Sequence, residues 1–480
     1  MRAIYTTVTT RPPVGNTWFG DVLQSRMGMV LSCLLYVSTF GVVYRWVIVP
    51  VWGYEGFRWR ATLARAALSG VLAVLPSLWM PIGLQRPSQV VYWMLYLLVL
   101  VPACVVTICA LEDQSSGPVL LSASLVTGFA LTGLAYRVPV LLPPPLNLKN
   151  YEFGVILVLL STTFYAFLVS SFGLQFHLVS FEDTYSVRAV YQSTLDQAPI
   201  LVAYAISWQA WVINPLVMAI GFRWRRPSWI LVGVVAQFAI YSITAFRSMF
   251  FSAGLLIYLL WSTRTGKPFG IRLVNSWTAI FAGASALKFF GLALMPAALV
   301  NVRMTALPGL LTGYYYEFFS SHPHALLGHS ILRSWVPYPC AVQPPYLIAF
   351  TYFRSASMES NANLWADAYA NFGYEGIMVS SILLGLVLWL YDSMASGRDK
   401  RLAALIIGLP AFALANTGLL TALLTNGIGL AVVLVYLMPP TFYTRSPDEG
   451  SGERSELRPV SSQRDAGRGG VSARRRAFAP

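Results

Sequence analysis

The chain has 480 residues, of which 56% are hydrophobic and only 11% are charged. A soluble domain carries about 25% charged residues, so this composition excludes an ordinary soluble protein and indicates a membrane protein. The net charge of +14 comes from basic residues in short connections and a C-terminal tail, which is typical of inside-positive topology and argues against nucleic acid as a partner.

Apolar stretches close to the roughly 20 residues that a membrane helix needs begin near the N-terminus. Barrel strands would alternate between apolar and polar residues, and these stretches do not. A polar connection, 177–198, separates the fifth stretch from the sixth. The first six spans are expected at 27–48, 62–81, 90–110, 119–136, 153–176 and 200–222.

The later spans carry more charge. The seventh and eighth share 229–262, with Arg247 between them, and the ninth carries Lys288 in mid-span. A long polar loop is predicted between the ninth and tenth spans. The remaining ranges are 273–300 for the ninth span, 301–376 for the loop, a tenth span that begins at about 372, and 402–438 for the last two.

These observations predict an all-α, polytopic bundle of about twelve transmembrane helices within residues 1–440, with the lipid bilayer as its surroundings. Residues 441–480 are rich in Ser, Gly and Arg and hold few large apolar side chains. Such a segment buries too little to fold alone, so we predict a disordered, basic, cytoplasmic tail.

Basic clusters set the expected orientation, because cytoplasmic connections are enriched in Lys and Arg. The alternation of spans then places the 177–198 and 301–376 loops together on the outer side, where they can meet over one cavity. Arg58 and Arg60 also fall outside, against the trend. The clusters used are at 223–226, 264–272 and 398–401.

Several motifs in these outer segments form a pattern. They are Tyr185-x-x-Arg188, Thr244-Ala-Phe-Arg247-Ser248, Arg303-x-x-x-x-Pro308-Gly309, the run Glu317-Phe-Phe319 and the run from Asn361 to Tyr374. Their order and their side of the membrane resemble those of the bacterial oligosaccharide repeat-unit polymerases, the Wzy-type polymerases of O-antigen and capsule synthesis. The resemblance covers about residues 180–430, and it departs from the family at Arg247, where that pattern would have a lysine.

The resemblance implies a multi-pass glycosyltransferase of the bacterial inner membrane, with a helical bundle like those of other membrane glycosyltransferases. Its substrate would be an oligosaccharide on undecaprenyl diphosphate. The enzyme would transfer the growing chain onto the next lipid-linked unit at the outer face. A chain-length regulator and a flippase would be its protein partners.

Glycosyl transfer from a diphosphate requires that charge on the leaving group be stabilised. The outer segments offer arginines but no paired-carboxylate motif. Arginine binds phosphate oxygens through a bidentate fork and stays charged. We therefore expect a metal-independent reaction without a cofactor, in which Arg188, Arg247 and catalytic Arg303 converge on one outward-facing pocket and hold the diphosphate.

The reaction also uses a base, for which the candidates are His329, Glu317 and Asp367. Histidine is the side chain whose ordinary titration range lies nearest neutral pH. Asp367 could equally cap the helix of the tenth span. Tyr185, Tyr315 and Tyr374 are the candidates for binding the glycan, and an interfacial aromatic belt explains the tyrosines equally well.

Two other functions remain open at this point. An O-antigen ligase, or another lipid-linked glycosyltransferase, would use a similar donor with a different acceptor. A transporter would have broken helices with ligands near the membrane midplane, where Lys288 is the obvious charge.

Overall fold

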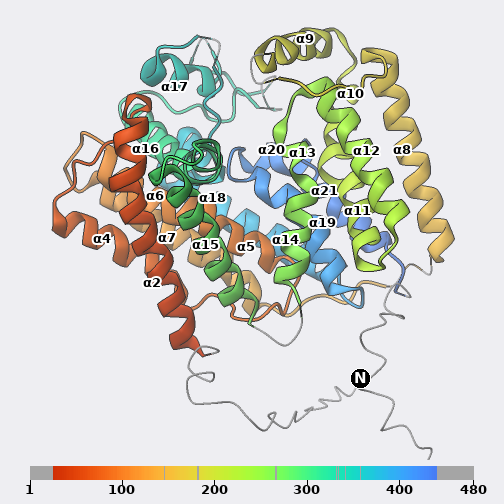
Figure 1. The fold of residues 1–480 in the computed structure, drawn as a ribbon, viewed down its shortest axis with the longest axis horizontal. Coiled ribbons are helices and arrows are strands. Elements are labelled where there is room, and N and C mark those ends of the chain that lie inside the picture. Colours follow the sequence, from red (N-terminus) through yellow and green to blue (C-terminus); the bar gives the residue numbers. More distant parts are fainter. Residues whose placement is uncertain are drawn as a thin grey trace, which may run out of the picture. The chain divides into compact units, whose positions relative to one another are not determined.

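The computed structural model describes residues 25–440 except 145, 147, 181–182, 265–267, 331, 333–334, 341 and 357. Helices and their connections make up this described part, which contains no strand (Figure 1). The predicted tail, 441–480, lies outside the described residues.

The helices of the first half, in chain order, are α2 (Arg26–Val43), α3 (Val49–Trp52), α4 (Leu63–Val74), α5 (Gln89–Leu95), α6 (Val101–Ala110), α7 (Gly117–Gly133), α8 (Asn150–Phe172), α9 (Thr184–Gln197), α10 (Ile200–Trp208) and α11 (Asn214–Arg223). Those of the second half are α12 (Pro227–Thr244), α13 (Arg247–Phe250), α14 (Ser252–Ser262), α15 (Phe269–Phe289), α16 (Leu307–Phe319), α17 (Pro344–Phe353), α18 (Leu364–Met394), α19 (Lys400–Ala413), α20 (Leu419–Leu424) and α21 (Ile428–Leu437).

Prolines explain a recurrent irregularity in these helices. Within the described residues, π-helical stretches occur at η1 (Tyr44–Ile48), η4 (Tyr96–Leu100), η6 (Gln209–Ile213) and η7 (Ala297–Ala306). Each has a proline at the second position after its last residue: Pro50, Pro102, Pro215 and Pro308. Proline lacks an N–H, and its ring clashes with the carbonyl four residues earlier. A wider turn relieves this conflict, so the helices continue through prolines that would otherwise break them.

Eight helices among the described residues are long and apolar enough to cross a membrane. Two shorter apolar helices, Leu63–Leu78 and Ser252–Ser262, add to them. Every range in which a span was predicted contains a helix. The prediction of an all-helical chain with multiple membrane-length helices is therefore confirmed, whereas the count of twelve spans stays a prediction.

The loop predicted at 301–376 is shorter in the structure. Its first part is helical, because η7 and α16 run without interruption to Phe319, and its last part is the start of α18. The charges of Arg303 and Glu317 had suggested a polar loop, but the residues between them are mostly apolar or aromatic and largely buried. Gly309 lies so close to α6 that a Cβ there would clash with the Pro102 carbonyl. In the remaining connection, 320–363, the described residues form one helix, α17.

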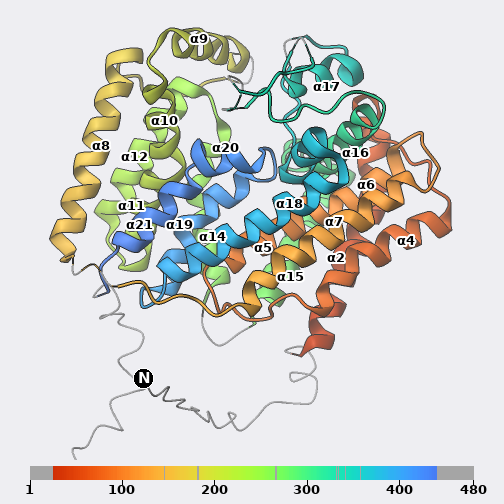
Figure 2. The same ribbon diagram turned by 180° about the vertical axis from the view of Figure 1, so that it is seen from behind.

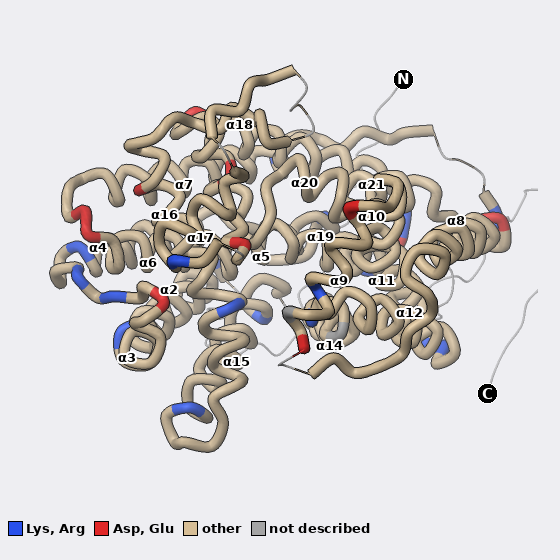
Figure 3. The backbone as a smooth tube through the Cα atoms, turned by 90° about the horizontal axis from the view of Figure 1, so that it is seen from above, with Lys and Arg blue, Asp and Glu red and all other residues tan. Residues whose placement is uncertain are grey.

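The connections are sorted between two ends of the bundle (Figures 1 and 2). α9 and α17 lie at one end, which we call the loop end, and the α11–α12 and α18–α19 connections lie at the other. Seen from the loop end, basic and acidic positions are interspersed around α2, α4, α9 and α17 (Figure 3). The tyrosine hydroxyl of Tyr346 in α17 interacts electrostatically with Asp196 in α9, so the two segments of the loop end are neighbours.

Arginines tie helices together at the opposite end, which we call the basic end and define by Arg26, Arg86, Arg223, Arg272 and Arg398. Arg398 donates hydrogen bonds to the carbonyl oxygens of Tyr436 and Met438 at 2.7 and 3.1 Å, and Arg223 pairs with Asp399 at 2.7 Å. Cations near helix C-termini satisfy carbonyls that lack a partner within the helix. These arginines come from different connections in the sequence, but in the structure they lie at the same end of the bundle and bind neighbouring helices there.

Candidate functional site

The first turn of α18 is fixed to α16 by Asn363. The Asn363 amide oxygen accepts hydrogen bonds from the backbone N–H groups of Trp365 and Ala366 at 3.0 and 3.1 Å, as an N-cap residue does. Its amide nitrogen donates to the Thr312 hydroxyl of α16 at 2.7 Å. This asparagine, and not Asp367, caps the helix, so Asp367 is not needed as the cap.

Asn371 holds the segment that precedes His329 against the same helix. The backbone N–H of Leu327 donates to the Asn371 amide oxygen at 2.7 Å. Leu326 and Leu327 have φ angles of 49° and 62°, in the left-handed region that costs energy for residues other than glycine. This strained turn folds the chain back over α18 and carries His329 towards Asp367.

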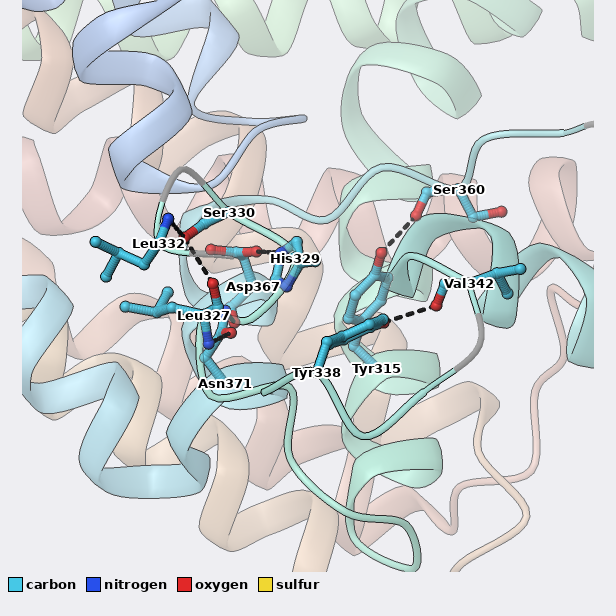
Figure 4. Close-up of polar contacts among 10 residues, drawn as sticks. All are labelled: Tyr315, Leu327, His329, Ser330, Leu332, Tyr338, Val342, Ser360, Asp367 and Asn371. Atoms are coloured by element: carbon cyan, nitrogen blue, oxygen red, sulfur yellow. Dashed lines mark hydrogen bonds and ion pairs between the residues drawn. The ribbon is translucent and has the colours of Figure 1, made fainter. Parts of the chain in front are cut away.

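His329 and Asp367 form the centre of the site (Figure 4). Nε2 of His329 lies 3.8 Å from Oδ1 of Asp367, and the two side chains are 16% and 27% exposed. The Tyr338 ring lies 5.8 Å from the His329 ring. On its other side Asp367 packs against Gly418, where a Cβ would clash with the carboxylate. Three segments distant in sequence therefore enclose this pair.

The His329 ring has one nitrogen without a partner. Its Nδ1 atom is buried and finds no hydrogen-bond partner among the described residues. At 3.8 Å the carboxylate is beyond hydrogen-bond distance, but its negative charge favours the tautomer with the proton on the nitrogen that faces it. Nδ1 is then left as a lone-pair acceptor. A base oriented by a carboxylate in this way is a common element of nucleophile activation.

A break in α18 lies directly after this face of the helix. Phe372 and Gly373 depart from helical geometry, and Gly373 has φ 62° and ψ −144°, a conformation that only glycine adopts readily. A Cβ on Gly373 would lie 3.4 Å from Nε2 of His324. Glycine at this position therefore permits the break, and His324 lies beside it.

The tyrosines predicted to bind glycan differ in their placement. Tyr315 is 1% exposed and donates to the Ser360 carbonyl at 2.9 Å, so it supports the site from within and does not offer its ring to a ligand. Tyr374 is half-buried, with its ring 5.3 Å from that of Tyr369. Tyr185 lies in α9, and its side chain is outside the described residues.

Arg188 and Arg247 come together at a second location of the loop end. Arg188 donates to the Ala245 carbonyl at 3.2 Å and lies 5.4 Å from the centroid of the Phe246 ring. Arg247, the next residue along that turn, donates to the Thr184 hydroxyl of α9 at 2.9 Å. The contact of α9 with the α12–α13 turn thus holds two guanidinium groups.

Arg303 and Glu317 lie at different points of the continuous helical stretch formed by η7 and α16. Arg303 is exposed on η7 and interacts electrostatically with Glu55. Glu317, at the end of α16, accepts a hydrogen bond from Tyr352, and burial raises the pKa of its carboxyl. The interactions of the described residues therefore place Arg303 with Glu55, apart from those of Arg188 and Arg247, and Glu317 with Tyr352, apart from those of His329.

Arg58 and Arg60, whose outer position was unexplained in the sequence, occupy the same neighbourhood as Glu317. Both contact Glu112, at 3.4 and 2.6 Å.

Among the described residues, no group of three or more His, Cys, Asp or Glu side chains could hold a metal ion, and we assign no metal ligands.

Asn363, Asn371, Tyr338 and Gly418 were not assigned roles from the sequence. A signal existed for the first two, because Asn363, Asp367 and Asn371 recur at intervals of four and so share one helical face.

Comparisons of the chain with protein-family models, with curated proteins and with solved structures found no match. The chemistry of the site is therefore the basis for assigning a function.

Proposed function

We propose that this chain is a glycosyltransferase that polymerises undecaprenyl-diphosphate-linked oligosaccharide units at the outer face of the bacterial inner membrane. The observation that carries the proposal is the His329–Asp367 pair, in which a carboxylate faces one ring nitrogen at 3.8 Å and the other nitrogen is a buried acceptor without a partner among the described residues. Such a pair can accept a proton from a hydroxyl group.

The orientation follows from the two ends of the bundle. Basic connections face the cytoplasm in membrane proteins, so the basic end is proposed to lie inside. The loop end, with α9, α17 and the His329–Asp367 pair, then faces outwards. A lipid-linked glycan presented at the outer leaflet would reach this end without crossing the membrane.

The reaction then proceeds as a single displacement. A hydroxyl oxygen of the acceptor unit attacks the anomeric carbon of the donor, and the bond from that carbon to the diphosphate oxygen breaks. The hydroxyl proton passes to Nδ1 of His329 once substrate binding has uncovered this buried atom, and the Asp367 carboxylate stabilises the imidazolium that forms. The leaving diphosphate keeps the bonding electron pair and needs no proton.

Arg188 and Arg247 are the groups proposed to stabilise that diphosphate. Two guanidinium groups on one short contact make a site for a dianionic group, since each binds phosphate oxygens through a fork of N–H donors. Asp196 of α9 acts electrostatically on Tyr346 of α17, so α9, which carries Arg188, lies within electrostatic range of the connection that carries His329. Arg303, which interacts with Glu55, and Glu317, which interacts with Tyr352, are proposed to contact more distant parts of the substrate.

A transporter is a second candidate, and the break at Phe372–Gly373 favours it. Transporters bind their substrates at the ends of discontinuous helices.

A ligase would share the donor half of the proposed reaction and differ only in its acceptor, so its products would be single transfers and not a ladder of lengths.

The test uses surface glycan from a deletion strain complemented with wild type or variants. Wild type should restore a ladder of chain lengths. His329→Gln should lower polymer by about 100-fold or more, because a positioned base contributes about 10²–10⁴ in rate. His322→Gln is the matched control: this exposed histidine stacks on Phe318, with ring centroids 4.1 Å apart, and its loss should leave the ladder intact.

Membrane levels of each variant are measured by immunoblotting so that activity and insertion are separated. A normal ladder in the deletion strain would contradict the proposal. Loss of all surface glycan, single units included, would favour the transporter.

A further inference from the structure

A pocket of about 390 Å³ lies between α8, α11 and α12, on the flank of the bundle where α8 forms the edge (Figures 1 and 2). Pockets of about 300–1,000 Å³ with a few polar groups among aliphatic walls are typical of small-molecule sites. Ser161, in the wall, is about 17 Å from either end of α8 by the rise per residue, so the pocket lies halfway along a membrane-length helix. The lining consists of Ser161, Thr162, Tyr165, Gln209, Asn214, Val217, Val232, Gly233 and Ala236.

Three amide side chains at this pocket form one hydrogen-bonded network. Gln209, Asn214 and Gln237 are each no more than 3% exposed, and all their N–H groups have acceptors. The bonds run from Gln209 to Ser161 and Asn214, from Asn214 to Tyr165 and Gln237, from Gln237 to the Ala210 carbonyl and the Met249 sulfur, and from the Tyr165 hydroxyl to the Ala236 carbonyl. The amide donors of the network are therefore fully used.

One acceptor of the network is left over. The Oε1 atom of Gln209 is buried and has no hydrogen-bond partner among the described residues. The neighbours fix the orientation of this amide, because turning it over would bring its oxygen against Oδ1 of Asn214, which only accepts. A buried acceptor without a donor costs free energy. The network is therefore completed by a ligand that donates a hydrogen bond.

This accounting selects the class of ligand. A fatty acyl chain brings no donor, and a phosphate or carboxylate brings only further acceptors and a charge. A metal ion would find a single free oxygen, whereas hard cations take about six oxygen ligands. An ammonium group would find no carboxylate among the lining residues. A hydroxyl group on an apolar body suits both the free oxygen and the aliphatic walls.

The mouth of the pocket faces outwards from the bundle. Thr162 of α8 and Val232 of α12 line it, and both are exposed, Val232 by 62%. Both helices are long and apolar enough to cross a membrane, so a molecule dissolved in the bilayer reaches this mouth without passing through water. The Gln209 oxygen itself lies behind the lining, so an entering ligand moves a side chain aside to contact it.

We propose that this pocket binds a small, uncharged alcohol dissolved in the membrane, whose hydroxyl donates a hydrogen bond to the Gln209 side chain. Its apolar body would occupy the space lined by Val217, Val232 and Ala236. Water also supplies a donor, but these aliphatic walls offer it no partners. The inference goes beyond the proposed polymerase, because no residue of the pocket belongs to the His329–Asp367 site.

The experiment compares two probes that differ by one donor. The purified full chain in nanodiscs of phosphatidylcholine, a lipid without a hydroxyl group, is photolabelled with a diazirine-bearing octanol and, separately, with the methyl ether of the same molecule. Peptide mass spectrometry locates the label. The alcohol should label 161–165 and 232–236 about fivefold more than the ether does, the effect of one uncharged hydrogen bond.

Two variants test the donor and the space. Gln209→Met keeps the length of the side chain and removes its oxygen, so the preference for the alcohol over the ether should disappear. Because both probes are compared within this variant, a general loss of labelling does not mimic the result. Val232→Trp fills the mouth and should abolish labelling by both probes. Val235→Trp is the matched control, at an exposed valine of α12 outside the lining, and should label like wild type.

Equal labelling of the two segments by alcohol and ether would overturn the inference, since the pocket would then accept any apolar molecule. Absence of labelling in both segments, as for a pocket that holds only water, would also overturn it, and so would a preference for the alcohol that persists in Gln209→Met. His329→Gln should label like wild type, so the outcome of the glycan-ladder test does not decide this one.

Discussion

The basic end and the loop end of this molecule use polar residues in opposite ways. At the basic end Arg398 is 6% exposed and donates to the carbonyls of Ser396, Tyr436 and Met438. At the loop end His324 and His329 each keep a buried Nδ1 atom without a partner among the described residues. A buried polar group without a partner costs free energy. Arg272 of the basic end also has a buried Nε atom without a partner among the described residues, although its Nη1 atom donates to the carbonyls of Trp261 and Ser262. The arginines of the basic end thus still join helices, whereas we propose that the unpaired nitrogens of the two histidines serve a ligand.

The largest effect on stability is expected at the basic end. Arg398→Met should lower the free energy of unfolding by about 3 kcal/mol, because it leaves buried carbonyl oxygens unpaired at about 1–3 kcal/mol each. Denaturant unfolding in detergent measures the change. The exposed Arg226 gives the control Arg226→Met, with a change within about 0.5 kcal/mol. If the Arg398→Met protein is as stable as wild type, the basic end does not have the structural role proposed for it.

At the loop end, Asp367→Asn should reduce activity without reducing stability. Polymer should fall by about 100-fold, within the range for a positioned base, while the melting temperature stays close to that of wild type. If Asp367 acts through His329, the double variant with His329→Gln should be no worse than either single variant. Additive losses would show that the two residues act independently.

Gly373→Ala tests whether the break in α18 is needed. The positive φ at this position should make alanine destabilising by about 1.5 kcal/mol, within the range for strained backbone. Gly283→Ala in α15 is the control, because a Cβ there meets no atom within 4 Å, and alanine favours a helix. Chemical denaturation compares the two. Equal stability of both variants would mean that α18 can straighten.

The smallest effect is expected at the surface pair of Glu112. The Arg60 guanidinium, 2.6 Å away, holds the pKa of the Glu112 carboxyl below its usual value. The stabilisation is therefore present above the ordinary carboxyl pKa and is lost as pH falls through the lowered one. Glu112→Gln should lower the melting temperature slightly at pH 7 and leave it unchanged in acid. A difference in melting temperature between Glu112→Gln and wild type that grows as the pH falls would contradict this prediction.

Much of the fold was predictable because apolar length and basic clusters report directly on membrane helices and their connections. The segment 301–319 was mispredicted as a loop because Arg303 and Glu317 outweighed the apolar residues between them. The pairing of His329 with Asp367 depends on the left-handed turn at Leu326–Leu327. Neither residue is a glycine, so the sequence gives no sign of positive φ angles there. Likewise, nothing in local sequence links Arg303 to Glu55, because the packing of η7 against η1 brings the two residues within electrostatic range.

The π-helical turns before Pro50, Pro102, Pro215 and Pro308 have a consequence for how these helices tolerate change. One additional residue in a turn rotates everything after it by about 100° around the helix axis. The halves of such a helix therefore present different flanks to the bundle, and a helical wheel drawn through the whole length mixes inward and outward positions. A single-residue deletion in one of these turns would swing the following half out of register, unless its proline were replaced at the same time.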